Sequence, residues 1–243
     1  MAEPLLVVED LSVHFRAVKA LSHVSITVEA GQCAVLIGPN GSGKSTLIKA
    51  VAGLVRAKTG TITLAGRRME FLPPHQRARL GVAWAPDRGR VATDMTVRDN
   101  LLAGAYLCTD RAEVRRRLEN TFTMFPRLQE LQHRLAGDLS GGQRQLLVMA
   151  RALMAKPRLL LVDEPFTNLS PEATDEMISI INEVKSRGVG LLLAEHQLDA
   201  VLQVADKIYA LGAGQLVWEG TRDQFIQEKP MGLIYFDRAA SDL

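Results

Sequence analysis

The chain has 243 residues, of which 47% are hydrophobic and 23% charged, and this composition excludes a disordered or collagen-like protein. The 29 basic and 27 acidic side chains leave a net charge of +2. This balance lacks the basic footprint of a nucleic-acid-binding protein, so we expect no nucleic-acid partner. Cys33 and Cys108 are the only cysteines, and their wide separation indicates a reducing compartment rather than a disulfide framework.

No targeting or membrane-spanning segment is expected. The opening sequence MAEPLLVVED carries acidic residues where a signal peptide has basic ones, and signal peptides continue into a long apolar stretch. The longest apolar runs, such as residues 189–194, are far shorter than the ~20 residues that cross a bilayer. We therefore predict a cytoplasmic protein that reaches a membrane only through a partner.

Short β-rich runs predict several strands within residues 5–37, the last of them the apolar run CAVLI. The spacing of apolar residues then predicts a helix over 44–51 that ends at Gly53. Residues 60–65 and 82–85 are further predicted strands, and the Pro-Pro pair between them predicts a loop.

Helical patterns replace the strands in the middle of the chain. Thr96 and Asp110 are each followed three residues later by an acidic residue, which is typical of a helix start. Residues 110–125 have the apolar spacing of an amphipathic helix, and Pro126 ends it. We therefore predict a helical lobe in this part of the chain.

A β/α alternation returns after the helical lobe. Residues 159–162 and 189–194 are apolar runs that predict buried strands, and residues 171–186 between them predict a helix. Residues 207–211 and 215–219, joined by Gly-Ala-Gly, predict a hairpin. The order of these elements favours an α/β fold.

The clearest motif is the run GPNGSGKST, which directly follows the apolar run CAVLI and precedes a predicted helix. In this context glycines allow backbone N–H groups to surround a phosphate, and the start of the helix adds a positive dipole. Lys44 can reach the β- and γ-phosphates, and the Ser45 hydroxyl can coordinate Mg²⁺. The predicted phosphate loop consists of Gly38, Pro39, Asn40, Gly41, Ser42, Gly43, Lys44, Ser45 and Thr46.

Two adjacent acidic residues, Asp163 and Glu164, follow the apolar run LLLV. The carboxyl ends of strands are where ligands bind in open α/β sheets. Asp163 could hold Mg²⁺ through its water shell while Glu164 orients and deprotonates an attacking water. Together with the phosphate loop, this pair predicts hydrolysis of a bound nucleotide.

The run LSGGQ provides a second anion site at the start of another predicted helix, which Ser140 caps. One triphosphate at the phosphate loop does not obviously need this second site. Either Ser140 is merely a helix cap, or the site faces a nucleotide that another molecule holds.

The phosphate loop, LSGGQ, LLLVDEP and a later His196, in that order, resemble the nucleotide-binding subunit of ABC transporters over nearly the whole chain. The resemblance implies a P-loop NTPase (RecA-like) core with an antiparallel β subdomain and an inserted α-helical subdomain. ATP and Mg²⁺ are the implied cofactors. The resemblance also implies a head-to-tail dimer, either of two copies of this chain or of this chain with a second ABC ATPase. In this dimer each ATP lies between one phosphate loop and the opposing LSGGQ.

The resemblance also assigns roles to individual residues. Phe15 would stack on adenine, and His196 would contact the γ-phosphate. Lys44, Glu164 and His196 are the implied catalytic residues, and Ser45 and Asp163 the implied ligands of Mg²⁺. The residues expected to act across the dimer are Ser140, Gly141, Gly142 and Gln143.

Two short segments depart from the usual family pattern. The run APDRGR places Asp87 where the family usually has a glutamine. Asp87 could still approach Mg²⁺ or the attacking water, although a carboxylate cannot donate as an amide can. Residues 168–171, NLSP, replace the usual Leu-Asp after the catalytic glutamate. Both departures resemble the branched-chain amino-acid importer branch.

The resemblance implies one ABC ATPase domain over residues 1–243. Within it, 1–86 and 157–225 would form the nucleotide-binding core with the β subdomain, 87–156 the helical subdomain, and 226–243 a docked tail. The implied function is ATP hydrolysis on the inner face of the cell membrane, energising a permease that docks on the helical lobe. A substrate-binding protein would take part indirectly. Alternatives to an amino-acid importer are a soluble ABC-type ATPase, a urea or amide importer and a lipopolysaccharide exporter.

Overall fold

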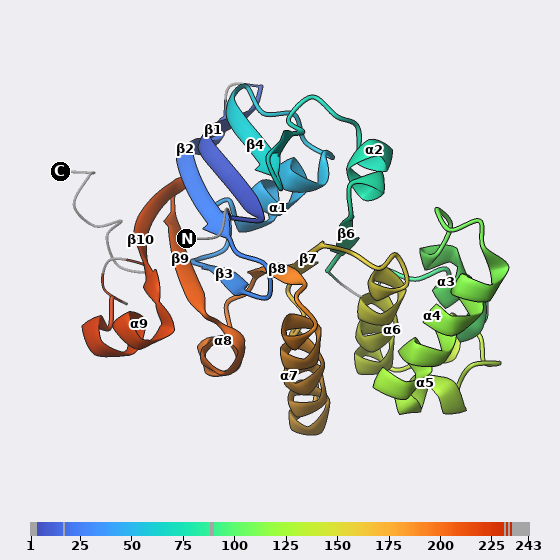
Figure 1. Cartoon of the computed structure of the whole chain (residues 1–243). Helices are drawn as coiled ribbons and strands as arrows, with labels where there is room; N and C mark the ends of the chain where they lie inside the picture. Colours follow the sequence, from blue (N-terminus) through green and yellow to red (C-terminus); the bar gives the residue numbers. More distant parts are fainter. Residues whose placement is uncertain (1–3, 17, 88–89, 231, 233, 235–243) are drawn as a thin grey trace.

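Two β-sheets and a lobe of helices make up the fold (Figure 1). The computed structural model describes residues 4–16, 18–87, 90–230, 232 and 234. Among these residues, no helix has the length and hydropathy that a membrane span requires.

The larger sheet has the strand order β10-β9-β3-β8-β7-β6. Its first five strands in chain order run parallel, and the last pairs antiparallel with its neighbour. These strands are β3 (Cys33–Ile37), β6 (Val82–Ala85), β7 (Leu159–Asp163), β8 (Gly190–Ala194), β9 (Lys207–Gly212) and β10 (Gln215–Thr221).

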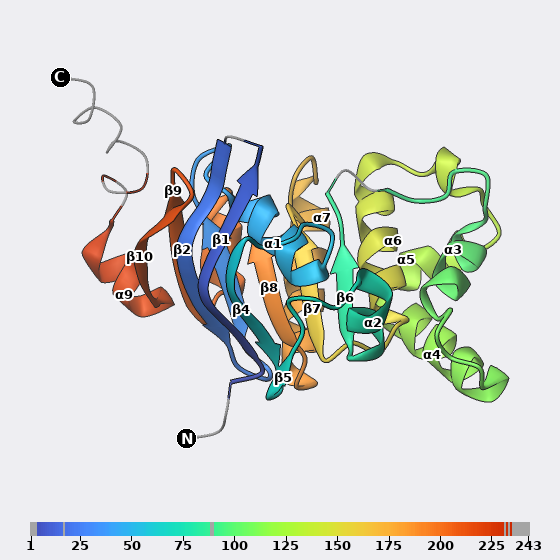
Figure 2. The same ribbon diagram turned by 90° about the horizontal axis from the view of Figure 1, so that it is seen from above.

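The smaller sheet is antiparallel, with the strand order β2-β1-β4-β5. Seen from above, it lies together with the first helix over one face of the parallel strands (Figure 2). Its strands are β1 (Leu6–Phe15), β2 (Val18–Val28), β4 (Thr59–Leu64) and β5 (Arg67–Arg68).

Helices cover both faces of the parallel sheet and also form the lobe beside it (Figure 1). Those on or near the sheet are α1 (Lys44–Ala52), α2 (Pro74–Arg79), α7 (Pro171–Ser186), α8 (Leu198–Val204) and α9 (Arg222–Glu228). Those of the lobe are α3 (Val97–Gly104), α4 (Arg111–Met124), α5 (Pro126–Glu130), the 3₁₀ turn Ala136–Asp138 and α6 (Gly141–Leu153).

Two hydrophobic cores lie on opposite faces of the parallel sheet. In β3, Cys33, Val35 and Ile37 belong to the core shared with α6, α7, α8 and the helical lobe. Ala34 and Leu36 belong to the core shared with α1 and the antiparallel sheet. A strand that is buried on both faces has an uninterrupted apolar sequence. This explains the run CAVLI in β3, all five residues of which are buried.

The predicted α/β fold is confirmed, and several of the predicted local signals are present. Thr96 and Asp110 accept hydrogen bonds from backbone N–H groups at the starts of α3 and α4. Gly53 ends α1 with a φ of 82°. The loop predicted at Pro73-Pro74 is wrong, because Pro74 is the first residue of α2. Proline suits that position, where its missing N–H has no helical partner to lose.

The C-terminal part of the chain is described only in part. Helix α9 crosses the expected boundary between residues 225 and 226. Most of the expected apolar tail lies outside the described residues. Within it, Ile234 is 3% exposed and belongs to the core around α7 and α8.

Arg77 ties α2 to the C-terminal end of α1. Its guanidinium donates to the backbone carbonyls of Ala50 at 2.6 Å, Val51 at 2.9 Å, Leu72 at 2.8 Å and Glu70 at 3.0 Å. The residue is 3% exposed, so these carbonyls would have no water to replace the lost bonds. The helix that begins with Lys44 is therefore fixed at its other end by one buried cation.

We expect Arg77→Ala to destabilise the fold by at least about 2 kcal/mol, because it leaves several buried carbonyls unsatisfied. Chemical denaturation would measure the change in free energy of unfolding. Arg79→Ala is the matched control, since Arg79 lies exposed on the same helix and should change stability by less than about 0.5 kcal/mol. Equal stability of the two variants would contradict this role for Arg77.

Candidate nucleotide site

The phosphate loop joins the end of β3 to the start of α1 and surrounds a cavity. Gly43, the residue before α1, has a φ of 107°, a conformation that favours glycine. A Cβ on Gly38 would lie 2.1 Å from the carbonyl oxygen of Leu211, so no side chain fits there. The cavity measures about 210 Å³ and is lined by residues 40–46, Ala20 and Glu164.

Lys44 is buried within this loop, with an exposed fraction of 6%. Its ammonium donates to the carbonyl oxygens of Gly38 at 2.7 Å and Pro39 at 3.2 Å. Burial lowers the pKa of Lys44, and the nearby carboxylates of Glu164 and Asp163 act against that shift. The loop therefore holds its cation beside the cavity, where it can pair with a phosphate.

Ser45 and Asp163 connect the phosphate loop to the end of β7. The Ser45 hydroxyl donates to a carboxylate oxygen of Asp163 at 2.9 Å. Asp163 is 2% exposed. Burial raises its pKa, and the negative charges of Asp87 and Glu164 add to the effect. Ser45 and Asp163 offer oxygen atoms as ligands, and Mg²⁺ prefers oxygen ligands, so the pair fits this ion.

Glu164 has an unusual backbone conformation, with a φ of 51°. Such left-handed conformations are uncommon outside glycine and are frequent at functional sites. Its N–H donates to the carbonyl of Ala194 on β8 at 2.9 Å, and its side chain lines the cavity. Its carboxylate accepts from the Thr167 hydroxyl at 3.3 Å. The side chain of Gln145 on α6 donates to the Glu164 carbonyl at 3.4 Å, which links the helical lobe to this acid.

His196 follows Glu195 at the end of β8. The imidazole is 45% exposed, whereas the Glu195 side chain is completely buried. One oxygen of the Glu195 carboxyl accepts from the backbone N–H of His196 at 3.1 Å. Burial raises the pKa of Glu195 to about 7, and Glu164 and Asp163 contribute to the rise.

The LSGGQ segment forms the start of α6, where Ser140 and Gln143 make a reciprocal capping box. The Ser140 hydroxyl accepts from the Gln143 N–H at 3.2 Å, and the Gln143 side chain accepts from the Ser140 N–H at 2.9 Å. Within the described part of the chain, no residue of LSGGQ lines the phosphate-loop cavity. The two predicted anion sites thus do not meet within one chain.

Phe15 and Asp87 lie at the edges of the site. Phe15 ends β1, pairs with Val18 and is 49% exposed, so about half of the residue is accessible to a ligand. Asp87 follows β6 and lies close enough to Asp163 to raise its pKa. Arg90 is 3.9 Å from the Asp87 carboxylate. Neither residue lines the cavity, as far as the described residues show.

Sequence reasoning did not identify Ala20, Gln145, Thr167 or Glu195 as site residues. Ala20, Gln145 and Thr167 belong to none of the sequence motifs. They reach the site because of the way β2, α6 and the turn after β7 pack. Glu195 did carry a signal, because it is a charged residue at the end of an otherwise apolar run beside His196.

Comparison with known proteins identifies the family. The sequence model described as ABC transporter matches residues 21–167. Over 213 residues the chain is 36% identical to the high-affinity branched-chain amino acid transport ATP-binding protein BraG of Pseudomonas aeruginosa, covering 88% of this chain and 91% of that protein. The chain belongs to the ABC transporter ATP-binding family.

Other relatives of this ABC ATPase agree with that assignment. The chain is 33% identical over 233 residues to the lipopolysaccharide export system ATP-binding protein LptB of Haemophilus influenzae. This match covers 95% of this chain and 96% of that protein. The solved ADP conformation of MJ1267, an ATP-binding cassette of an ABC transporter, superimposes with a TM-score of 0.82 at 29% identity, covering 95% and 97% of the two chains. The P-loop NTPase fold and the ATPase activity are thereby confirmed.

We expect Lys44→Ala and Glu164→Gln to separate binding from hydrolysis. Lys44→Ala removes the charge that pairs with phosphate and should weaken nucleotide affinity by at least about tenfold. Glu164→Gln should keep affinity but lower the hydrolysis rate by ~10²–10⁴, because a general base acts only when water attacks. Titration with a fluorescent ATP analogue and a phosphate-release assay would measure the two effects. Hydrolysis by Glu164→Gln at the unaltered rate would contradict the assignment.

Proposed function

We propose that this ABC ATPase energises the import of branched-chain or related amino acids through a separate permease, working at the inner face of the cell membrane. The observation that carries the ATPase part is the junction of the phosphate loop with Asp163 and Glu164 at the ends of β3 and β7.

The proposed mechanism assigns each side chain of the site one task. Lys44 exchanges its bonds to Gly38 and Pro39 for the β- and γ-phosphates of ATP. Ser45 and Asp163 would hold Mg²⁺, with Asp87 near it, and the bound ion would neutralise phosphate charge. Glu164 orients the attacking water and accepts its proton. The remaining proposed contacts are Phe15 on adenine and His196 on the γ-phosphate.

The proposed active unit is a head-to-tail dimer, either of this chain or with a second ABC ATPase. Gly141 supports this arrangement, because a Cβ there would meet no described atom within 4 Å apart from its chain neighbours and the backbone of its own helix. Its φ also lies outside the left-handed range. Nothing within one chain therefore requires glycine there. A phosphate approaching the N-terminus of α6 from another molecule does favour a residue without a side chain.

We expect Glu164→Gln to form a stable dimer with Mg·ATP, because ATP then bridges two chains without being hydrolysed. Size-exclusion chromatography with light scattering would detect the dimer. Adding Ser140→Arg, which places a bulky side chain at the shared site, should return the protein to a monomer. A Glu164→Gln protein that stays monomeric at high micromolar concentration would contradict the proposed sandwich.

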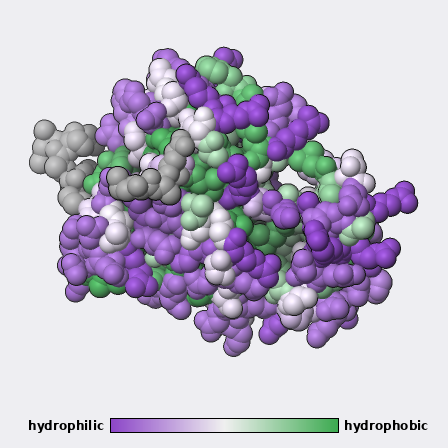
Figure 3. All heavy atoms as spheres, in the orientation of Figure 1, coloured by the Kyte–Doolittle hydropathy of each residue, from purple (hydrophilic) through white to green (hydrophobic). Residues whose placement is uncertain are grey.

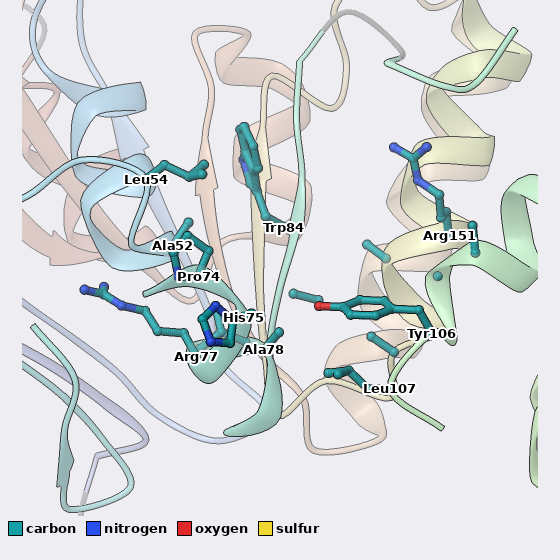
Figure 4. A pocket seen from close by; sticks show the side chains of 16 residues that line it. Ala52, Leu54, Pro74, His75, Arg77, Ala78, Trp84, Tyr106, Leu107 and Arg151 are labelled. Atoms are coloured by element: carbon teal, nitrogen blue, oxygen red, sulfur yellow. The ribbon is translucent and has the colours of Figure 1, made fainter. Parts of the chain in front are cut away.

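A groove between the core and the helical lobe is the proposed docking place of the permease. It measures about 450 Å³ and is lined by α1, α2, β6, α6 and the end of α3 (Figure 4). Tyr106, 65% exposed, reaches across it from the lobe toward α2, with Leu107 beside it. On the face seen in Figure 3, hydrophilic residues predominate and hydrophobic ones lie in several patches between them. A short helix with an apolar face would bury these side chains.

The groove also fits the proposed organisation of the chain as one ABC ATPase domain. In this division, residues 1–86 and 157–225 form the core with its β subdomain, 87–156 form the helical subdomain, and 226–243 form the tail. The groove then lies where the first two parts meet, so a docked permease segment would contact both. A movement of the helical subdomain relative to the core would therefore change the contacts with the docked permease segment.

The proposed cargo rests on the relatives of the chain and on two short sequence segments. BraG is a branched-chain amino acid transport protein, and the APDRGR and NLSP segments of this chain resemble that branch. Lipopolysaccharide export is the second candidate, because LptB is 33% identical over nearly the whole chain. Cargo is recognised by other subunits, and ATPase surfaces can be similar in systems with different cargo.

We expect deletion of the gene to lower uptake of labelled leucine, isoleucine and valine, with the native chain restoring it and Glu164→Gln failing to do so. Urea uptake and surface lipopolysaccharide would be measured in the same strains. Loss of either one with normal amino-acid uptake would overturn the proposed cargo. Purification of the native protein without any membrane subunit, together with unchanged transport, would favour a soluble ATPase.

A further inference from the structure

Glu195 is a buried carboxyl group that the proposed mechanism does not use. Its side chain has an exposed fraction of 0%. One carboxyl oxygen accepts the His196 N–H at 3.1 Å, and the other finds no hydrogen-bond partner among the residues that the structure describes. A leucine or methionine would fill similar space without burying a polar group, so folding alone does not explain a glutamate here.

The position of Glu195 connects it to the phosphate loop. Its backbone N–H donates to the carbonyl of Leu36 on β3 at 3.0 Å, two residues before Gly38. Lys44 and Glu164 lie near enough to change its pKa. The backbone at residue 195 therefore ties the end of β8 to the strand that leads into the nucleotide site, and it places the Glu195 side chain near Lys44 and Glu164.

A second side chain, that of Gln197, holds the segment that follows β8. The Gln197 side chain donates to the carbonyl of Phe166 at 3.2 Å, which ties the segment to the turn that follows Glu164. Glu195 and Gln197 thus anchor the backbone on both sides of His196, while the imidazole between them remains 45% exposed. This arrangement leaves the ring accessible but restricts the direction in which it leaves the backbone.

We propose that Glu195 is a positioning residue for hydrolysis, whose carboxyl oxygen holds the His196 backbone N–H and so directs the imidazole toward the γ-phosphate. The proposal rests on the proposed role of His196. The His196 Nδ1 lies 3.8 Å from the same carboxyl oxygen, which is longer than a hydrogen bond, so Glu195 acts through its bond to the backbone N–H rather than through its negative charge. Its pKa near 7 agrees with that, because a buried carboxyl that readily becomes neutral still keeps an oxygen acceptor.

A double-mutant cycle tests the proposal. The variants are Glu195→Leu, Glu195→Gln, His196→Ala and the double variant Glu195→Leu/His196→Ala. We expect Glu195→Leu to lower kcat by about tenfold or more with KM within about threefold, because the bond matters in the reaction and not in binding. Glu195→Gln keeps an oxygen acceptor and should restore most of kcat. In the His196→Ala background, Glu195→Leu should lower kcat by less than about twofold, because coupled residues are not additive.

A matched control and a stability measurement exclude a merely structural effect. Glu70 is also buried, at 6% exposed, and has an unpartnered carboxyl oxygen, but it lies beside Arg68 and away from the cavity. Glu70→Gln should change kcat by less than about twofold. Thermal melting of all variants would identify any that do not fold. If Glu195→Leu does not fold, Glu195→Ala takes its place in the cycle.

Three results would overturn the proposal. Glu195→Leu could lower kcat equally with and without His196, or Glu195→Gln could be as slow as Glu195→Leu, or His196→Ala could leave kcat unchanged. Failure of the proposed ATPase mechanism looks different, because Glu164→Gln would then hydrolyse ATP at the unaltered rate. The four measurements therefore separate the role of Glu195 from the role of the site.

Discussion

The hydrogen bond between Ser45 and Asp163 is the contact on which the nucleotide site depends. It joins the first turn of α1 to the end of β7, although the two residues are 118 positions apart in the sequence. The sheet makes this contact possible, because β8 alone lies between β3 and β7. The phosphate-binding and water-activating halves of the site therefore come together only when the long segment between them folds beside the sheet.

Two further contacts extend from this junction to the helical lobe and the groove. Gln145 on α6 donates to the Glu164 carbonyl, so the helix that carries LSGGQ at one end touches the acid proposed as general base. On the other side, Arg77 lines the groove and binds the last carbonyls of α1, the helix that starts with Lys44. Helix α6 thus contacts the site through Gln145, and Arg77 contacts the helix whose first residue is Lys44. In the proposed complex, these contacts would connect both partner-facing surfaces to the reacting groups.

Much of this structure could be predicted from local sequence signals, because their physical causes are local. Strand β6 occupies its predicted residues, and so does α7, which Ser170 caps. Helix α2 was missed because a proline pair is equally compatible with a turn and with a helix start. The contacts of Gln145 and Glu195 could not be predicted, because they depend on which elements pack side by side. Spacing along the chain carries no such information.

The charges of the site explain why a cation should be required for ATP to bind in a reactive form. Asp163, Glu164 and Glu195 all lie near enough to Lys44 to act on its pKa, and Lys44 is the one buried lysine among the residues that the structure describes. The raised pKa values of Asp163 and Glu195 show that negative charge is already costly there. A triphosphate adds more negative charge to the same small cavity. In the proposed mechanism Ser45 and Asp163 would hold a divalent cation, and its positive charge would offset the negative charge of the carboxylates and the triphosphate.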